Sequence, residues 1–264
     1  MKKEYKIIIM LLAILTVINV IPLEDSASKI TIVGSSSVQP LCEQLVEEYK
    51  KTTNNTDINV QGGGSSLGIK CANQSVADIG MSSKEIQCKD LKEHEIGKEA
   101  IVVIVNNKNP INDISTEELQ EIFSGKIKNW NEISNKSGKI NVITREEGSG
   151  TLDSFKKTIM KNNSIKKDAI VQNSAGSIKQ SVMHDENAIG FVSLIHIDKQ
   201  VKNLSIDKIT PSDESVMDGS YKLERPFILL TNQKPNNHTT DFINWIKSNE
   251  SQEIFNREKI IRVG

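Results

Sequence analysis

The stretch KITIVGSSSVQPL, residues 29–41, decides the fold. A run of mostly β-branched residues, typical of a buried strand, passes directly into a glycine–serine turn, and Pro40 then opens a segment with apolar residues at helical spacing. The same order of strand, Gly/Ser loop and helix recurs over residues 58–74 and 142–161. Alternating strands and helices of this kind predict an α/β fold with mainly parallel strands.

Two apolar runs divide the chain. AIVVIV (100–105) and PFILLT (226–231) are typical of strands that are buried on both faces. The segment after the second run is too short for a domain of its own, so we expect it to return to the first domain. We therefore predict lobe I at residues 29–105 plus 226–264, lobe II at residues 106–225, and a ligand cleft between the lobes.

The first 28 residues have the composition of a targeting segment. Three lysines precede an apolar run at residues 7–20, and the small residues Ser-Ala-Ser follow at 26–28. This is the order of regions in a secretory signal, and the run is short for a membrane-spanning helix. We expect residues 1–28 to be a signal peptide or an N-terminal membrane anchor. The protein would then be exported and extracytoplasmic, and tethered to the cell membrane if the segment is retained.

The composition excludes several classes of protein. The chain has 33 Lys and Arg against 34 Asp and Glu, a net charge of −1, and only 4% aromatic residues, which argues against nucleic-acid binding. The four histidines lack the spacing of metal ligands, so we expect no metal and no cofactor. The three cysteines, Cys42, Cys71 and Cys88, leave both a Cys71–Cys88 bridge and free thiols open.

The three Gly/Ser loops place hydroxyls at the beginnings of expected helices. The first backbone N–H groups of a helix have no partner and the helix dipole is positive there, which suits an anion. Arg145 is the one cation in these loops, and it offers a planar fork of donors. The Gly-x-Ser-x-Gly pattern of a hydrolase nucleophile is not met around Ser149. We therefore expect a tetrahedral oxyanion as the ligand and no enzymatic activity.

Together, these loops and their surroundings resemble the PstS-type family of phosphate-binding proteins, which serve phosphate ABC transporters. The matching motifs are GSSSVQPL (34–41), GGGSSLG (62–68), ADIGMSS (77–83), IFSGKIKNW (122–130), REEGSGT (145–151) and AIGFV (188–192). The resemblance covers nearly all of residues 29–264. It implies a two-lobed periplasmic-binding-protein-like fold of type II, whose α/β lobes close over the anion.

The resemblance also implies the residues of the site. Glu147 occupies the position of an acid that holds the arginine in place, and Ser83 stands where well-known members have an aspartate that accepts the proton of phosphate. Discrimination against sulfate would then rest on another acceptor, for example Glu147. The implied phosphate ligands are Ser36, Ser37, Ser65, Ser83, Arg145, Ser149, Gly150 and Thr151.

The function implied by the resemblance is that of an exported solute-binding protein. It would capture inorganic phosphate in the interlobe cleft and deliver it to the permease subunits of an ABC transporter in the membrane. We expect it to act as a monomer. Two alternatives stay open: a receptor for another oxyanion, such as sulfate or molybdate, and a surface-anchored phosphate sensor.

Overall fold

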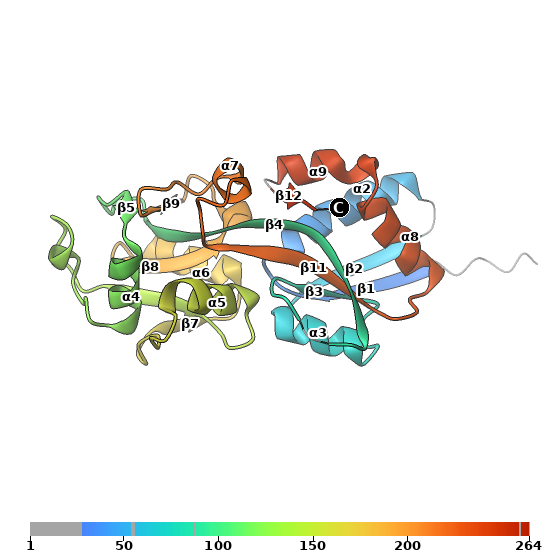
Figure 1. Cartoon of the computed structure of the whole chain (residues 1–264), viewed down its shortest axis with the longest axis horizontal. Coiled ribbons are helices and arrows are strands. Elements are labelled where there is room, and N and C mark those ends of the chain that lie inside the picture. The colour runs from blue at the N-terminus through green and yellow to red at the C-terminus, as the bar shows by residue number, and fades with distance from the viewer. Residues whose placement is uncertain (1–27, 54–55, 87, 259, 264) are drawn as a thin grey trace, which may run out of the picture.

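The computed structural model describes residues 28–53, 56–86, 88–258 and 260–263. Figure 1 shows two lobes, one at each end of the long axis, joined by long strands. The expected signal peptide or anchor falls on residues 1–28, of which all but the last lie outside the described residues. Within the described ranges, no helix is long and apolar enough to cross a membrane.

The first part of the chain alternates strands and helices, as the 29–41 stretch predicts. Pro40 stands in the first turn of its helix, where the missing N–H costs no hydrogen bond. The elements are β1 (Ser28–Gly34), α2 (Gln39–Thr52), β2 (Thr56–Gly62), α3 (Ser65–Asn73), β3 (Ile79–Ser82) and the long β4 (Leu91–Asn106).

The middle of the chain forms the second lobe, and the last part returns to the first. The middle elements are β5 (Asp113–Ile114), α4 (Thr116–Ser124), a 3-10 turn (Trp130–Glu132), β6 (Asn141–Arg145), α5 (Gly150–Phe155), a π-helical turn (Lys156–Met160), β7 (Ile170–Gln172), α6 (Ala175–His184), β8 (Ala188–Ser193), a 3-10 turn (Leu194–His196), β9 (Val201–Asn203), β10 (Ser205–Ile206) and α7 (Asp213–Met217). The returning elements are β11 (Glu224–Asn232), α8 (Asn237–Ile246), a 3-10 turn (Asn249–Ser251), α9 (Gln252–Arg257) and β12 (Ile261–Arg262).

One mixed sheet runs through both lobes, in the order β2-β1-β3-β11-β4-β8-β6-β7, and β9 and β12 also pair with β4. β1 is parallel to β2 and β3, and β6 is parallel to β7 and β8. β11 is antiparallel to β3 and β4, and β4 is antiparallel to β8. The expectation of mainly parallel strands is therefore corrected, because β4 leaves the first lobe and β11 returns beside it in the opposite direction (Figure 1).

β4 is much longer than the sequence predicts. The apolar run at residues 100–105 marks only its second half, whereas residues 91–99 mix buried and charged positions. His94 and Glu99 are buried in this first half, and Lys92 and Glu93 are exposed. The charged residues in this half explain why the sequence does not predict it as part of a strand.

Each lobe has a hydrophobic core of its own. The core of the first lobe includes Leu41 of α2 and Phe227 of β11, and the core of the second lobe includes Phe155 of α5. β4 passes from the first core to the second between Ile96 and Ala100. The exact limits of the lobes expected from the sequence stay a prediction.

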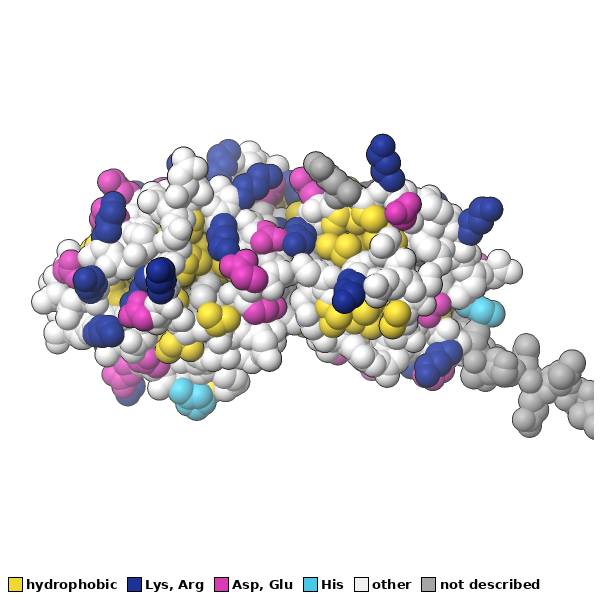
Figure 2. Space-filling view, turned by 90° about the horizontal axis from the view of Figure 1, so that it is seen from below, with side chains coloured by type: hydrophobic (Ala, Val, Ile, Leu, Met, Phe, Trp, Pro, Cys, Tyr) yellow, Lys and Arg dark blue, Asp and Glu magenta, His cyan; other side chains and the backbone are white. Residues whose placement is uncertain are grey.

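The surface carries charges of both signs. Figure 2, a view from below, shows two bulky lobes with Lys and Arg side chains mixed among Asp and Glu on both of them. The net charge is −1. Any anion site must therefore come from a local arrangement of donors and not from an overall positive field.

Candidate functional site

The first lobe brings three hydroxyls together at the ends of its strands. Gly34 (φ +146°) ends β1, and a Cβ there would lie 2.2 Å from the carbonyl oxygen of Met81 in β3. A Cβ on Gly68 of α3 would lie 2.5 Å from the same oxygen. Glycine at both positions therefore lets the first turns of α3 pack directly on the ends of β1 and β3. The residues that this packing brings together are Ser35, Ser65 and Ser83.

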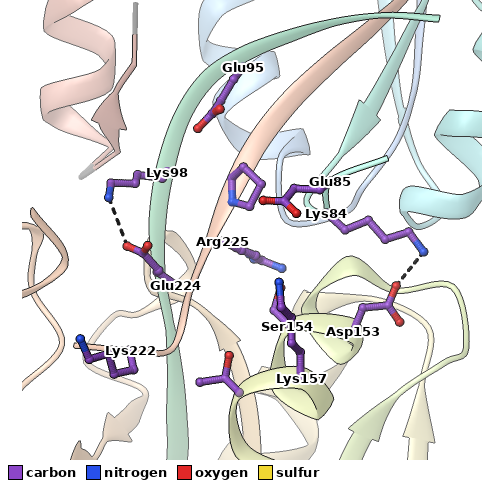
Figure 3. Close-up of a pocket in the computed structure, with 12 residues that line it drawn as sticks. Lys84, Glu85, Glu95, Lys98, Asp153, Ser154, Lys157, Lys222, Glu224 and Arg225 are labelled. Atoms are coloured by element: carbon purple, nitrogen blue, oxygen red, sulfur yellow. Dashed lines mark hydrogen bonds and ion pairs between the residues drawn. The ribbon is translucent and has the colours of Figure 1, made fainter. Parts of the chain in front are cut away.

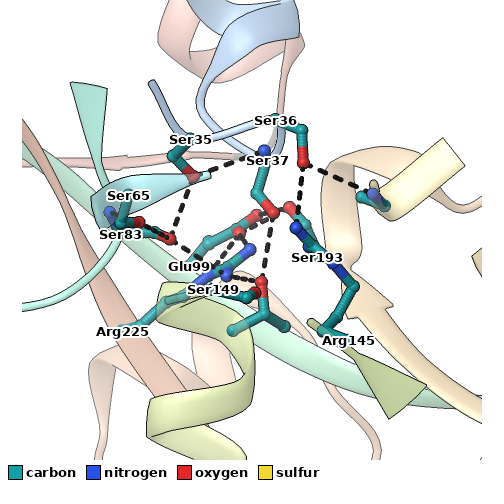
Figure 4. Close-up of polar contacts among 12 residues, drawn as sticks. Ser35, Ser36, Ser37, Ser65, Ser83, Glu99, Arg145, Ser149, Ser193 and Arg225 are labelled. Carbon is teal, nitrogen blue, oxygen red and sulfur yellow. Dashed lines mark hydrogen bonds and ion pairs between the residues drawn. The ribbon is translucent and has the colours of Figure 1, made fainter. Parts of the chain in front are cut away.

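These three side chains are buried and hydrogen-bonded to one another (Figure 4). Ser35 Oγ donates to Ser83 Oγ at 3.0 Å, and the Oγ atoms of Ser65 and Ser83 lie 3.2 Å apart. The backbone N–H of Ser83 donates to Ser65 Oγ at 3.1 Å. A hydroxyl can turn its single hydrogen toward a new acceptor, so this group can supply several donors to one anion.

The second lobe contributes the beginning of α5. Ser149 caps this helix, its Oγ accepting from the backbone N–H of Leu152 at 3.4 Å. A Cβ on Gly150 would lie 2.5 Å from Ser83 Oγ and 2.8 Å from Ser65 Oγ. The beginning of α5 therefore rests on the hydroxyls of the first lobe, with room for glycine but not for a larger residue.

Side chains of the two lobes also meet directly, so the lobes are closed on each other. Ser37 Oγ and Thr151 Oγ1 lie 3.2 Å apart, and Arg145 Nη2 donates to Ser36 Oγ at 3.3 Å. We call the resulting group the interlobe cluster, and its role in binding phosphate stays a prediction. It unites all the ligands implied by the resemblance: Ser36, Ser37, Ser65, Ser83, Arg145, Ser149, Gly150 and Thr151.

Glu146, and not the expected Glu147, holds Arg145. Arg145 Nε donates to Glu146 Oε2 at 2.8 Å, and Nη2 donates to Oε1 at 2.9 Å. The side chain of Glu147 is 82% exposed and pairs with Lys156 at 2.6 Å. The expectation for Glu147 is corrected because adjacent residues after a strand point in different directions, and the sequence offers two acids in a row.

Sequence reasoning missed a second arginine in the interlobe cluster. Arg225 of β11 is buried, its Nη1 donates to Ser83 Oγ at 3.3 Å, and Nη1 also contacts Thr151 Oγ1. Its Nε and Nη2 donate to Glu99 Oε1 of β4 at 3.1 and 2.7 Å. There is little indication of this pair in the sequence. Arg225 and Glu99 each stand just before an apolar run, where a charged side chain is normally exposed.

Burial shifts the ionisation of groups near the cluster. It raises the pKa of Glu99 and lowers that of Arg225, and the attraction between the two opposes both shifts. Burial also lowers the pKa of His196 to about 4, with repulsion from Arg225 adding to the effect and a backbone hydrogen bond with Ser36 opposing it. Each guanidinium is balanced by a carboxylate and the imidazole of His196 is neutral, so what the cluster offers an anion is hydrogen-bond donors from the guanidinium groups and hydroxyls.

The histidines, acids and cysteines of the described residues form neither a metal site nor a disulfide. In the part of the chain that the structure describes, no group of three or more His, Cys, Asp or Glu residues could hold a metal ion. Cys42, Cys71 and Cys88 are free thiols. Of the two alternatives for the cysteines, the structure has the free thiols and not the Cys71–Cys88 bridge.

Known proteins are similar to this chain in both sequence and architecture. Residues 22–250 match the family model of a PBP superfamily domain. The chain is 31% identical over 237 residues to the phosphate-binding protein PstS of Bacillus subtilis, an alignment covering 87% of this chain and 79% of that protein. The chain belongs to the PstS-type family of phosphate-binding proteins.

Solved structures of related proteins have a fold similar to that of this PstS-type chain. A putative phosphate ABC transporter substrate-binding protein with bound phosphate, from Clostridium perfringens, matches with a TM-score of 0.86 and 33% identity, over 90% of this chain and 100% of that chain. An ABC-type phosphate transport receptor from Vibrio cholerae matches with a TM-score of 0.71 and 32% identity, over 88% of this chain and 99% of that chain. The expected two-lobed periplasmic-binding-protein fold is thereby confirmed.

Proposed function

We propose that this protein is an exported receptor that captures inorganic phosphate in the interlobe cluster and delivers it to an ABC transporter. The observation that carries the proposal is the closed, buried set of hydroxyls and guanidinium groups to which both lobes contribute. The names of the relatives from Bacillus subtilis, Clostridium perfringens and Vibrio cholerae agree with it.

The chemistry of the cluster suits a tetrahedral oxyanion. Phosphate presents four oxygens, each able to accept several hydrogen bonds, and it must lose its water when the lobes close. The Ser and Thr hydroxyls, the first backbone N–H groups of α5 and Arg145 replace that water. Selectivity follows because a smaller or differently shaped ligand would leave buried donors unpaired, which is costly.

Closure of the lobes would couple capture to delivery. Ser36 with Arg145, and Ser37 with Thr151, join the lobes around the site. Opening these contacts on a permease would expose the anion and lower its affinity. We propose that the receptor works outside the cytoplasm as a monomer and without catalysing a reaction, and that residues 1–28 direct its export or anchor it to the membrane.

Calorimetric titration of the protein, stripped of anion, with phosphate and then with sulfate at pH 6 and pH 8 tests the proposal. Tight phosphate binding with no heat from sulfate is the expected result. Comparable binding of sulfate would make the protein a general oxyanion receptor, an outcome that Ser83 in place of an acid keeps open. No heat from either anion would refute the proposed site.

A further inference from the structure

We infer that Arg225 is a second cationic ligand of the bound anion, presented to it from the strands that join the two lobes. The inference rests on the proposed function, because the interlobe cluster is taken as the anion site. No motif in the Gly/Ser loops contains this residue, and it adds a positive group to a site for which the sequence predicts Arg145 alone.

The position of Arg225 is fixed by an ion pair within the sheet. Arg225 of β11 and Glu99 of β4 are register partners in neighbouring antiparallel strands, and they are 2% and 1% exposed. Arg225 Nη2 lies 2.7 Å from Glu99 Oε1. Glu99 is held in turn by the hydroxyl of Ser193 and by the backbone of Ile195. One edge of the guanidinium is thus bound to a carboxylate that cannot turn away.

The other edge of the guanidinium faces the interlobe cluster. Nη1 donates to Ser83 Oγ at 3.3 Å (Figure 4). The same nitrogen contacts Thr151 Oγ1. Ser83 belongs to the first lobe and Thr151 to the second, so this single nitrogen lies where the two halves of the site meet. An anion that binds between the Ser83 and Thr151 hydroxyls must therefore meet Nη1 of Arg225.

Arg225 also settles the direction of the Ser83 hydroxyl. Ser83 Oγ accepts hydrogen bonds from Arg225 Nη1 at 3.3 Å and from Ser35 Oγ at 3.0 Å. A hydroxyl oxygen has two acceptor positions, and both are then occupied. The Ser83 hydrogen then points at Ser65 Oγ, 3.2 Å away, and can turn to an oxygen of the anion when one binds, so Ser83 acts as a donor.

Arg225 lies between the cluster and a hollow in the surface. This hollow has a volume of about 590 Å³, and Arg225 lines it together with Lys84 and Asp153 (Figure 3). Lys84 and Asp153 form an ion pair between the lobes at 2.7 Å. Removing the guanidinium would thus connect the anion site to water as well as removing a donor.

The test replaces the ion pair as a unit. Arg225→Met alone would leave Glu99 buried without its partner and could unfold the protein, so the main variant is Arg225→Met with Glu99→Gln, and Arg225→Lys is the second. Arg262→Met is the matched control, because Arg262 packs on Phe255 outside the cluster. Circular dichroism and thermal melting without ligand establish that each variant is folded.

Phosphate affinity is then measured by calorimetry. Loss of one hydrogen bond to a charged group predicts phosphate binding about 10- to 100-fold weaker in the double variant. Arg225→Lys, which keeps the charge but not the fork, should lie between the double variant and the unmodified protein. The Arg262→Met protein should bind like the unmodified one.

The failures of the two proposals can be told apart. If the unmodified protein binds no phosphate, the proposed function is wrong. If it binds phosphate and the folded double variant binds equally well, the role of Arg225 is wrong. A crystal structure with phosphate gives an independent answer: Nη1 of Arg225 within hydrogen-bonding distance of a phosphate oxygen supports the inference, and Nη1 remaining on Thr151 away from the anion overturns it.

Discussion

Replacing Gly150 with alanine adds one methyl group where the beginning of α5 meets the first lobe. The new Cβ would lie 2.5 Å from Ser83 Oγ, 2.7 Å from the Ser83 carbonyl oxygen and 2.8 Å from Ser65 Oγ. Contacts this short force atoms apart, and one of these neighbours is backbone that cannot rotate away. Because Ser83 and Ser65 belong to the other lobe, the clash exists only when the lobes are closed.

The expected size of the effect follows from this geometry. Inserting a methyl group into a packed site typically costs 1–3 kcal/mol, which here falls on the closed state and predicts phosphate binding about 5- to 150-fold weaker. Gly150 has a helical conformation at the first position of α5, which alanine also adopts. The free energy of unfolding without ligand should therefore stay the same or rise slightly.

The assay combines calorimetric titration with thermal melting, with and without phosphate. Gly176→Ala is the matched control, since Gly176 is also near the beginning of a helix, but its nearest neighbour would lie 4.0 Å from the new Cβ. Weak phosphate binding by Gly150→Ala, with an unchanged or slightly higher melting temperature in the absence of phosphate, is the expected result. Phosphate affinity equal to that of Gly176→Ala would refute the reasoning that the lobes close on this residue.

Three further predictions follow from the same contacts. Arg145→Met should weaken phosphate binding about 100-fold or more in calorimetry, since the charge is lost and Glu146 is left unpaired beside the anion, and adding Glu146→Gln should restore part of it. Lys84→Met removes a partly exposed ion pair between the lobes, so stopped-flow measurements should find phosphate release about two- to fivefold faster; an unchanged rate would contradict a closing role. Burial lowers the pKa of His196 to about 4 from 6.5, so the unfolded chain takes up a proton first as the pH falls through 6.5. The free energy of unfolding should then drop by about 3 kcal/mol between pH 6.5 and 4 from this group alone, and urea unfolding of His196→Gln should have a smaller drop.

Most of this fold could be predicted from local sequence patterns. The strand, loop and helix order around residues 29–41 recurs in the structure, and helices begin where the Gly/Ser loops end. The prediction was weakest where a strand is charged. Residues 91–99 of β4 carry exposed acids and lysines, because this segment bridges two lobes and is covered unevenly. A continuous apolar run indicates a strand that is buried on both faces. The first half of β4 has exposed positions, so its sequence has no such run.

The candidate site, too, was predicted from the sequence only in part. The sequence by itself determined which loops carry hydroxyls and Arg145, because the turn chemistry of glycine and the capping preference of serine are local properties. Only the tertiary structure decided that Glu146 and not Glu147 holds Arg145, since the direction of a side chain after a strand depends on what packs around it. It alone decided that Arg225 meets Glu99, 126 positions away, inside the sheet. Such a pair leaves no local trace, because burying two charges is stable only when the fold places each beside the other.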